Sequence, residues 1–151
     1  MNKLIAAMVT ILTVFSGIVL FSMSLSPNWS VQRRVYVNAK PDAIMPYVNN
    51  VKSWVKWNDW TSARGVTGTK LLSKDSKNIV YELQQNGKVK AEKSTVTVVR
   101  AEYGAYVFLK VEGRTDASPL TRYLIMLHND VLGKQLTSGL LELKDKVEKN
   151  Q

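Results

Sequence analysis

The sequence predicts an α+β protein in which a curved antiparallel sheet of about five strands wraps around one long C-terminal helix, with an apolar helix in front. Three observations support this fold class. Residues 4–25 carry no charge, residues 29–113 contain several segments that alternate apolar and polar side chains, and residues 120–147 repeat apolar side chains every three to four positions. We therefore divide the chain into an N-terminal transmembrane anchor, 1–26, and a folded domain, 27–151.

The uncharged segment from Leu4 to Leu25 is long enough to cross a bilayer once as a helix, because about 1.5 Å per residue spans roughly the 30 Å hydrocarbon core. A cleaved secretory signal is the alternative, since Met1-Asn2-Lys3 resembles a short basic leader. Signals have apolar runs of roughly 7 to 15 residues, so the longer run favours an uncleaved anchor. Trp29 follows at the expected membrane interface.

The orientation of the anchor depends on basic residues at its two ends. Lys3 favours an N-terminus in the cytoplasm, whereas Arg33, Arg34 and Lys40 pull in the opposite direction under the positive-inside rule. We expect a single-pass membrane protein with an extracytoplasmic domain.

Composition limits the chemistry of the domain. The absence of cysteine excludes disulfides, thiol catalysis and thiolate zinc sites. His128 is the only histidine, and the 12 acidic residues are scattered, so we expect no metal and no cofactor. No serine, histidine and carboxylate arrangement is visible, and His128 beside Asn129-Asp130 suggests an exposed helix surface. We therefore predict no catalytic residue.

The net charge of +9 favours adhesion to anionic lipid headgroups. Nucleic acid is the competing partner for a basic protein. The clustered lysines alternate with Leu, Val and Thr, as on the solvated face of strands, and no recognition helix accompanies them, so no nucleic acid is expected. These lysines are Lys70, Lys74, Lys77, Lys88, Lys90 and Lys93.

The domain begins with a predicted strand from Trp29 to Asn38, which Pro41 ends. Apolar side chains at helical spacing follow between Pro41 and Trp57. Pro46 and the pair Asn49-Asn50 interrupt this spacing, so it predicts two short helices.

A meander of four strands follows, with expected ranges 68–72, 78–84, 90–100 and 105–113. Turn residues separate them at Asp75-Ser76, Asn86-Gly87 and Tyr103-Gly104. Asn-Gly is a strong signal for a type I′ hairpin turn, which makes the sheet antiparallel.

The last element is a long amphipathic helix with Ser118 as its N-cap and Pro119 in its first turn. Gly133 and Gly139 interrupt it. Close packing against the sheet is the favoured explanation of both glycines, and a bend beside a cavity is the other. Its apolar positions are Leu120, Leu124, Leu127, Val131, Leu136, Leu140, Leu143 and Val147.

Three segments carry a resemblance to a known family: Val37-Asn-Ala-Lys-Pro-Asp42, Trp54-Val-Lys-Trp57-Asn-Asp-Trp60 and Gly139-Leu-Leu-Glu-Leu143-Lys144. They resemble the polyketide cyclase/dehydrase and lipid-transport family of the START-like (SRPBCC) superfamily. The resemblance covers residues 29 to 149 and implies a helix-grip fold. Between Trp60 and the terminal helix this sequence has only four strands where the family usually has six, which implies a cavity that is smaller or open at one side.

The resemblance also implies that a lipid or other hydrophobic small molecule binds between the sheet and the C-terminal helix. An ordinary role in the core is the alternative for each candidate residue. The tyrosines are favoured, because a buried hydroxyl needs a polar partner. The candidate ligand-binding residues are Tyr81, Leu83, Val96, Val98, Tyr106, Phe108, Tyr123, Met126 and Leu127.

Two further hypotheses remain open at the level of sequence. One is a module that binds a protein partner and has a filled core. The other is a polyketide cyclase/dehydrase-like enzyme, for which Glu82, Glu112 or Tyr106 would carry a proton. An internal void favours a ligand, and a packed interior favours a protein partner.

Overall fold

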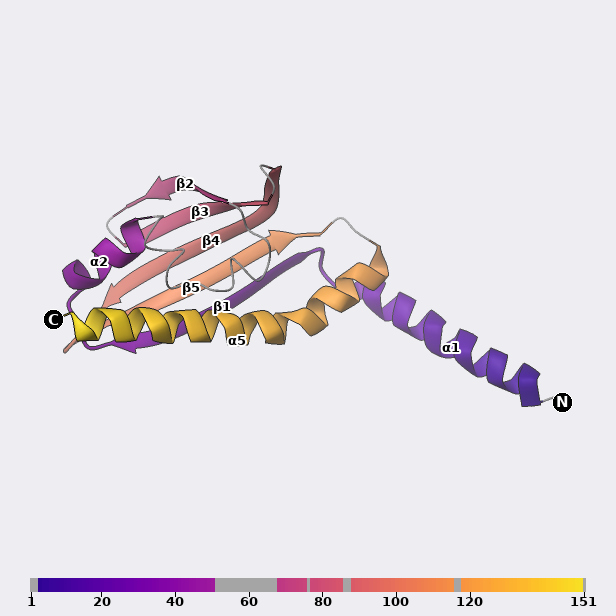
Figure 1. Ribbon diagram of the computed structural model, residues 1–151. Helices are drawn as coiled ribbons and strands as arrows, with labels where there is room; N and C mark the ends of the chain where they lie inside the picture. The colour runs from indigo at the N-terminus through magenta and orange to yellow at the C-terminus, as the bar shows by residue number, and fades with distance from the viewer. Residues whose placement is uncertain (1–2, 51–67, 76, 86–87, 116–117, 151) are drawn as a thin grey trace.

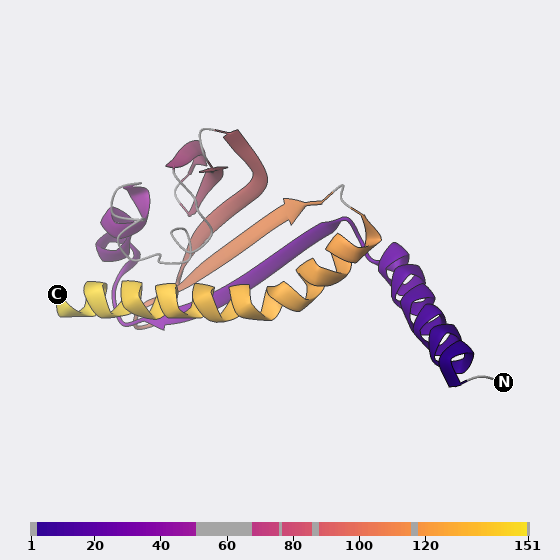
Figure 2. The ribbon, with the colours of Figure 1, turned by 45° about the vertical axis from the view of Figure 1, so that its right-hand side comes forward.

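The computed structural model describes residues 3–50, 68–75, 77–85, 88–115 and 118–150. In this part of the chain a five-stranded antiparallel sheet curves over one long helix, α5, while an apolar helix, α1, projects away from the domain (Figure 1). The short helix α2 lies at the opposite end of the domain from α1, and a second view shows the same arrangement (Figure 2). This architecture confirms the predicted α+β helix-grip fold.

Helix α1 runs from Lys3 to Ser24, within one residue of the predicted segment. Its large apolar side chains are exposed, because the helix extends beyond the sheet. In the described residues it is the one helix long and apolar enough to cross a membrane, and a signal sequence would meet the same criterion.

The strands are β1 (Asn28–Val37), β2 (Gly68–Lys74), β3 (Asn78–Gln85), β4 (Lys88–Arg100) and β5 (Ala105–Arg114). Their order in the sheet is β1-β5-β4-β3-β2, so four consecutive strands form a meander and β1 pairs with the last of them. All five strands agree with the sequence prediction to within three residues at each end.

Two of the predicted turns can be compared with the structure. Asp75 accepts hydrogen bonds from the backbone N–H groups of Lys77 and Asn78 at 2.7 and 2.6 Å, and these bonds lower the pKa of its carboxyl group. Ala101 N–H donates to the carbonyl of Gly104 at 2.9 Å, which closes the turn between β4 and β5. The predicted Asn86-Gly87 turn lies outside the described residues.

Helix α2 spans Pro41–Asn49 and continues through Pro46, so the predicted interruption at this proline is wrong. Proline removes one hydrogen bond from the helix. Ile44 and Val48, on either side of Pro46, are fully buried in the core, and their packing offsets that loss. The second predicted short helix and the three tryptophans Trp54, Trp57 and Trp60 lie outside the described residues.

Helix α5 spans Pro119–Lys149, with Ser118 as the N-cap residue and Pro119 in the first turn, as predicted. The predicted capping bond is absent from the described structure, since Ser118 Oγ lies 3.2 Å from the hydroxyl of Thr121 instead of bonding to a backbone N–H. The helix packs chiefly against β1.

The two halves of α5 differ in their packing. The second half buries apolar side chains that are at most 2% exposed, whereas the apolar side chains predicted for the first half are about half exposed. The prediction of a single packed apolar face along the whole helix is therefore wrong. The buried row is Leu132, Leu136, Leu140, Leu143 and Val147, and the exposed row is Leu120, Leu124, Leu127 and Val131.

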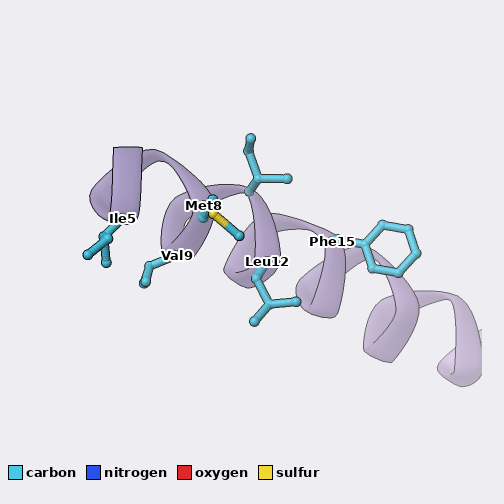
Figure 3. A pocket seen from close by; sticks show the side chains of 6 residues that line it. Ile5, Met8, Val9, Leu12 and Phe15 are labelled. Atoms are coloured by element: carbon cyan, nitrogen blue, oxygen red, sulfur yellow. The ribbon is translucent and has the colours of Figure 1, made fainter. Parts of the chain in front are cut away.

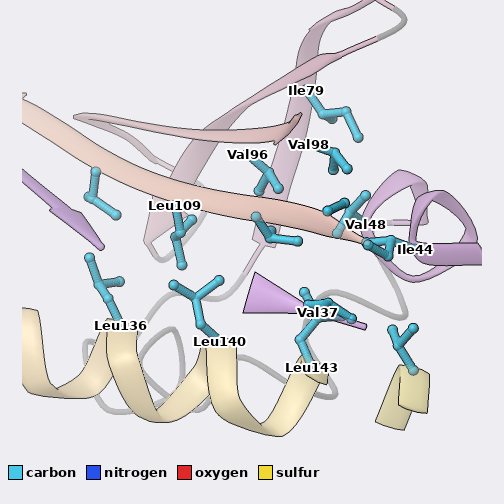
Figure 4. Close-up of a cluster of buried hydrophobic side chains, with 14 of the residues drawn as sticks. Val37, Ile44, Val48, Ile79, Val96, Val98, Leu109, Leu136, Leu140 and Leu143 are labelled. Carbon is cyan, nitrogen blue, oxygen red and sulfur yellow. The ribbon is translucent and has the colours of Figure 1, made fainter. Parts of the chain in front are cut away.

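The core lies between α5, α2 and the inner face of the sheet (Figure 4). Leu136, Leu140 and Leu143 point from α5 toward the sheet, and Ile44 and Val48 approach it from α2 (Figure 4). α2 contacts β4. The sheet supplies Val31, Val37, Ile79, Tyr81, Val96, Val98, Ala105, Val107, Leu109 and Val111.

Candidate functional site

One row of side chains crosses four strands on the inner face of the sheet. Tyr81 on β3 lies opposite Ser94 on β4, Ser94 lies opposite Val111 on β5, and Val111 lies opposite Val31 on β1. All four residues are at most 5% exposed. Because successive side chains of a strand point to opposite faces, this register brings two polar groups together on a face that is otherwise mainly aliphatic.

The hydroxyl of Tyr81 donates a hydrogen bond to the carbonyl oxygen of Val48 at 2.5 Å. This bond connects β3 to the C-terminal part of α2. Burial raises the pKa of Tyr81 to about 12, so the phenol keeps its proton even at pH values where an exposed tyrosine ionises. Tyr81 is thus a neutral polar group that anchors α2 over the inner face.

Ser94 is fully buried, and its Oγ has no hydrogen-bond partner among the described residues. Its neighbours on the same face of β4, Val96 and Val98, are also buried, while Thr95 and Thr97 are only half-buried on the outer face. An unpaired buried hydroxyl costs about 1–3 kcal/mol. A hydrogen bond from a bound molecule would remove that cost.

Two adjoining hollows of about 190 and 280 Å³ lie between the start of β1, the end of β5 and the first half of α5. They share Trp29, Thr115, Ile125 and Asn129 as lining residues. The larger hollow also reaches Leu25, directly after α1, so these hollows lie at the end of the domain from which α1 projects.

The hollows begin one row away from Ser94. Glu92, which lines the smaller hollow, lies two residues before Ser94 on the same face of β4, and it shares a row with Gly113 and Trp29. A molecule that occupies the hollows is therefore adjacent to the row containing Ser94 and Tyr81. Each hollow alone is smaller than a typical ligand pocket of roughly 300–1,000 Å³, so a ligand of ordinary size would extend through both.

The predicted candidates Tyr81, Val96 and Val98 come together on the inner face. Met126 lines the larger hollow, and Tyr123 is half-buried nearby on α5. Leu127 does not join them, because it lies on the exposed row of α5 and is 52% exposed. The side chain of Leu83 lies outside the described part of the structure.

The prediction that Tyr106 and Phe108 face the cavity is wrong. The buried residues of β5 are Ala105, Val107, Leu109 and Val111, so Tyr106 and Phe108 lie on the outer face. There Tyr106 packs edge-on against Tyr36, with ring centroids 5.4 Å apart, and the Arg34 guanidinium lies 5.7 Å from its ring centre. Residues 105–109 of β5 alternate aliphatic and aromatic side chains. Both faces of this part of the strand are therefore apolar, and the sequence pattern does not show which face is buried.

The three proton carriers considered for an enzyme also lie on this outer face. Glu82 lies opposite Lys93, and Lys93 lies opposite Glu112, which is four residues from Phe108 on the same face of β5. Glu112 forms an ion pair with Lys110. Glu82, Glu112 and Tyr106 are therefore separated by the sheet from the row that contains Ser94.

Sequence reasoning missed Ser94, Trp29 and Ile125 as site residues. Ile125 could have been found, because it lies 7 and 11 residues before Leu132 and Leu136 and so shares their helical phase. Ser94 gives no such signal, since a serine between Lys93 and Thr95 suggests solvent.

A larger hollow, of about 610 Å³, lies against α1 and is lined by residues of that helix alone (Figure 3). It is the uncovered apolar flank of a projecting helix, and it is no cavity of the domain. Within the described ranges, no group of His, Asp and Glu side chains is arranged to hold a metal ion.

Several solved structures share this fold. Protein MLL2253 from Mesorhizobium loti superposes with a TM-score of 0.60 at 12% sequence identity, over 82% of this chain and 99% of that one. The Zhui aromatase/cyclase from Streptomyces sp. R1128 gives a TM-score of 0.51 at 11% identity, over 81% of this chain and 94% of that one. The Aha1 dimer from Colwellia psychrerythraea gives 0.51 at 15% identity, over 80% and 96%.

These identities are low, so the similarities establish the helix-grip fold alone. No protein-family model and no curated protein sequence matches the chain.

Proposed function

We propose that this protein is a membrane-anchored helix-grip protein that binds a lipid or other hydrophobic small molecule between its sheet and α5. The observation that carries the proposal is the unpaired, fully buried hydroxyl of Ser94, placed beside Tyr81 on an apolar face. A ligand with a long apolar body and one polar group matches this surface. The likeness in fold to an aromatase/cyclase supports a hydrophobic ligand.

The chemistry of α1 supports the anchor. Its 22 residues are long enough to cross a bilayer. The hydroxyls of Thr10, Thr13 and Ser22 donate to the carbonyl oxygens four residues earlier, at 3.0, 2.9 and 2.7 Å, so these side chains need no partner in lipid. The single-pass topology with an extracytoplasmic domain is part of the same proposal.

The position of the hollows supports a ligand that comes from the bilayer. Leu25, directly after α1, and Met126 on α5 both line the hollow of about 280 Å³. An apolar molecule leaving the membrane at this point meets Trp29 and Ile125 before it reaches the Ser94 row. This short route keeps its apolar surface away from water.

Native mass spectrometry of the full chain, extracted from host membranes in a mild detergent, tests the proposal. We expect about one bound lipid or other apolar molecule per chain, identified by extraction with organic solvent. Ser94→Ala lowers its occupancy, whereas the matched variant Ser73→Ala, at an exposed position of β2 that lines neither hollow, leaves it unchanged.

A chain that stays empty after incubation with host lipid extract contradicts ligand binding. In that case the module for a protein partner becomes the better hypothesis, and crosslinking in membranes is the next experiment. Retained ligand with no effect of Ser94→Ala contradicts the proposed site but not the function.

A further inference from the structure

An apolar row on the first half of α5 remains uncovered by the described part of the domain. We name this row the α5 stripe. Its spacing of four, three and four residues places its members on one face of the helix. Its members are Leu120, Leu124, Leu127 and Val131, which are 47%, 53%, 52% and 47% exposed.

The same face of α5 becomes polar beyond the stripe. Continuing at helical spacing from Val131, the next positions are Lys134, Ser138, Glu142, Asp145 and Lys149. The change occurs as α5 moves away from α1 (Figure 1). An apolar surface confined to the part of the helix near α1 indicates a covering surface at that end of the domain.

The first half of α5 is attached to the exit of α1. Arg122 donates a hydrogen bond from Nη1 to the carbonyl oxygen of Leu25 at 3.4 Å, and the two residues line one hollow. At about 100° per residue, the α5 stripe lies on the opposite face of the helix from Arg122, Ile125 and Asn129. The stripe therefore faces away from the sheet.

Helix α1 also leaves the domain on the side of α5 that faces away from the sheet, as both views show (Figures 1 and 2). The α5 stripe and α1 thus expose apolar side chains toward the same side of the molecule. A bilayer crossed by α1 would lie along that side.

We propose that the α5 stripe rests in the interfacial region of the bilayer from which α1 emerges, so that the first half of α5 lies along the membrane surface. This inference rests on the membrane anchor of the proposed function. An amphipathic helix beside a spanning helix gains free energy by burying its apolar face at the boundary between headgroups and acyl chains. It also holds the hollows at the level of the lipids.

Charge near the end of the stripe supports a lipid surface as the occupant. Arg33 and Lys134 line one hollow of about 340 Å³, together with Thr137 and Ser138. In the described residues Arg33 has no carboxylate partner, and it donates to the carbonyl of its neighbour Gln32 at 2.8 Å. Two cations beside an apolar stripe complement the anionic headgroups of a membrane surface.

Because the sequence has no cysteine, single-cysteine labelling tests this inference cleanly. Full-length Leu127→Cys carries an environment-sensitive fluorophore and is reconstituted into vesicles of phosphatidylcholine and phosphatidylglycerol. Some of the lipids bear a nitroxide quencher on the acyl chain, either near the headgroup or near the bilayer centre. Val14→Cys reports on the middle of α1, and Asp145→Cys reports on the polar continuation of the same α5 face, away from the hollow that Arg33 and Lys134 line.

We expect the Leu127 label to be quenched by the shallow nitroxide on the order of threefold more than the Asp145 label. The Val14 label responds most strongly to the deep nitroxide. Leu124→Cys repeats the measurement, and circular dichroism of each labelled protein identifies a variant that fails to fold.

If the Val14 label is quenched but the Leu127 and Asp145 labels are quenched equally and weakly, the inference is overturned while the anchor stands. A Leu127 label that shifts to shorter wavelength without lipid quenching also overturns it, because a second copy or a protein partner then covers the stripe. No quenching at Val14 shows that the anchor itself fails, and the inference falls with it.

Discussion

Gly133 on α5 leaves the space that the guanidinium of Arg33 on β1 occupies. A Cβ atom on Gly133 would stand 2.1 Å from Nη2 and 2.7 Å from Cζ of Arg33. Gly133 thus provides close packing between α5 and the sheet, as the sequence predicted. The approach lets a long cationic side chain lie between the two elements and reach the hollow that Lys134 also lines.

Gly133→Ala tests this packing in a double-mutant cycle with Arg33→Ala. Alanine in a helix interior is favoured over glycine by about 1 kcal/mol, and we expect this gain in the Arg33→Ala background. With Arg33 present, the guanidinium must move, so the gain is smaller or becomes a loss. Chemical unfolding in detergent measures the coupling, which we expect to exceed about 0.5 kcal/mol. Additive free energies of unfolding would contradict this account.

Stability at alkaline pH depends on Tyr81. Its pKa is raised from 10.0 to about 12 by burial, so the folded protein binds this proton more tightly than the unfolded chain does. The contribution is fully present below pH 10 and is lost as pH rises toward 12. We expect the free energy of unfolding to fall by up to about 2–3 kcal/mol more in the parent protein than in Tyr81→Phe. Identical pH profiles would show that burial does not hold the proton.

Ser94→Ala should affect stability and binding in opposite directions. Removing the unpaired buried hydroxyl raises the free energy of unfolding of the ligand-free protein by about 1 kcal/mol. The same change weakens binding of the proposed hydrophobic ligand by about five- to tenfold, because one hydrogen bond is lost. Thermal unfolding with and without ligand measures both effects. A lower stability of the empty variant would mean that the hydroxyl already has a partner.

Leu140 and Leu141 form a matched pair of adjacent leucines on α5. Leu140 is 1% exposed and packs in the core, whereas Leu141 is 50% exposed. We expect Leu140→Ala to lower the free energy of unfolding by about 2–5 kcal/mol and Leu141→Ala to change it by less than about 1 kcal/mol. Urea unfolding of the two variants compares them directly. Similar losses in the free energy of unfolding would mean that α5 is rotated about its axis, with Leu141 as buried as Leu140.

The boundaries of the strands could be predicted because turn residues mark them, but the faces of two elements could not. On β5, aromatic and aliphatic residues alternate, and only the register with β4 shows that Val107 faces inward and Tyr106 outward. On α5, Val131 and Leu132 are adjacent apolar residues. The buried row continues through Leu132, while Val131 belongs to the exposed row.

The candidate site was only partly accessible to sequence reasoning. Tyr81 was identified because a buried tyrosine needs a polar partner, and it has one in the carbonyl of Val48. Ser94 becomes a candidate only when the strand register places it opposite Tyr81 and its burial leaves the hydroxyl unpaired. Pairing between strands and burial depend on tertiary structure, which local periodicity does not contain.

The pairing of β1 with β5 limits the order in which the sheet of this chain can form. Strands β2 to β5 pair with their immediate neighbours in sequence. The pairing of β1 with β5 joins residues far apart in sequence, such as Asn28 and Arg114, so it cannot form until β5 has been synthesised. With the membrane anchor that we propose, β1 would be held beside the bilayer during synthesis while the rest of the sheet is made. Contacts between distant residues form late because closing a long loop costs entropy. We expect folding to end when the completed meander and α5 capture the tethered strand.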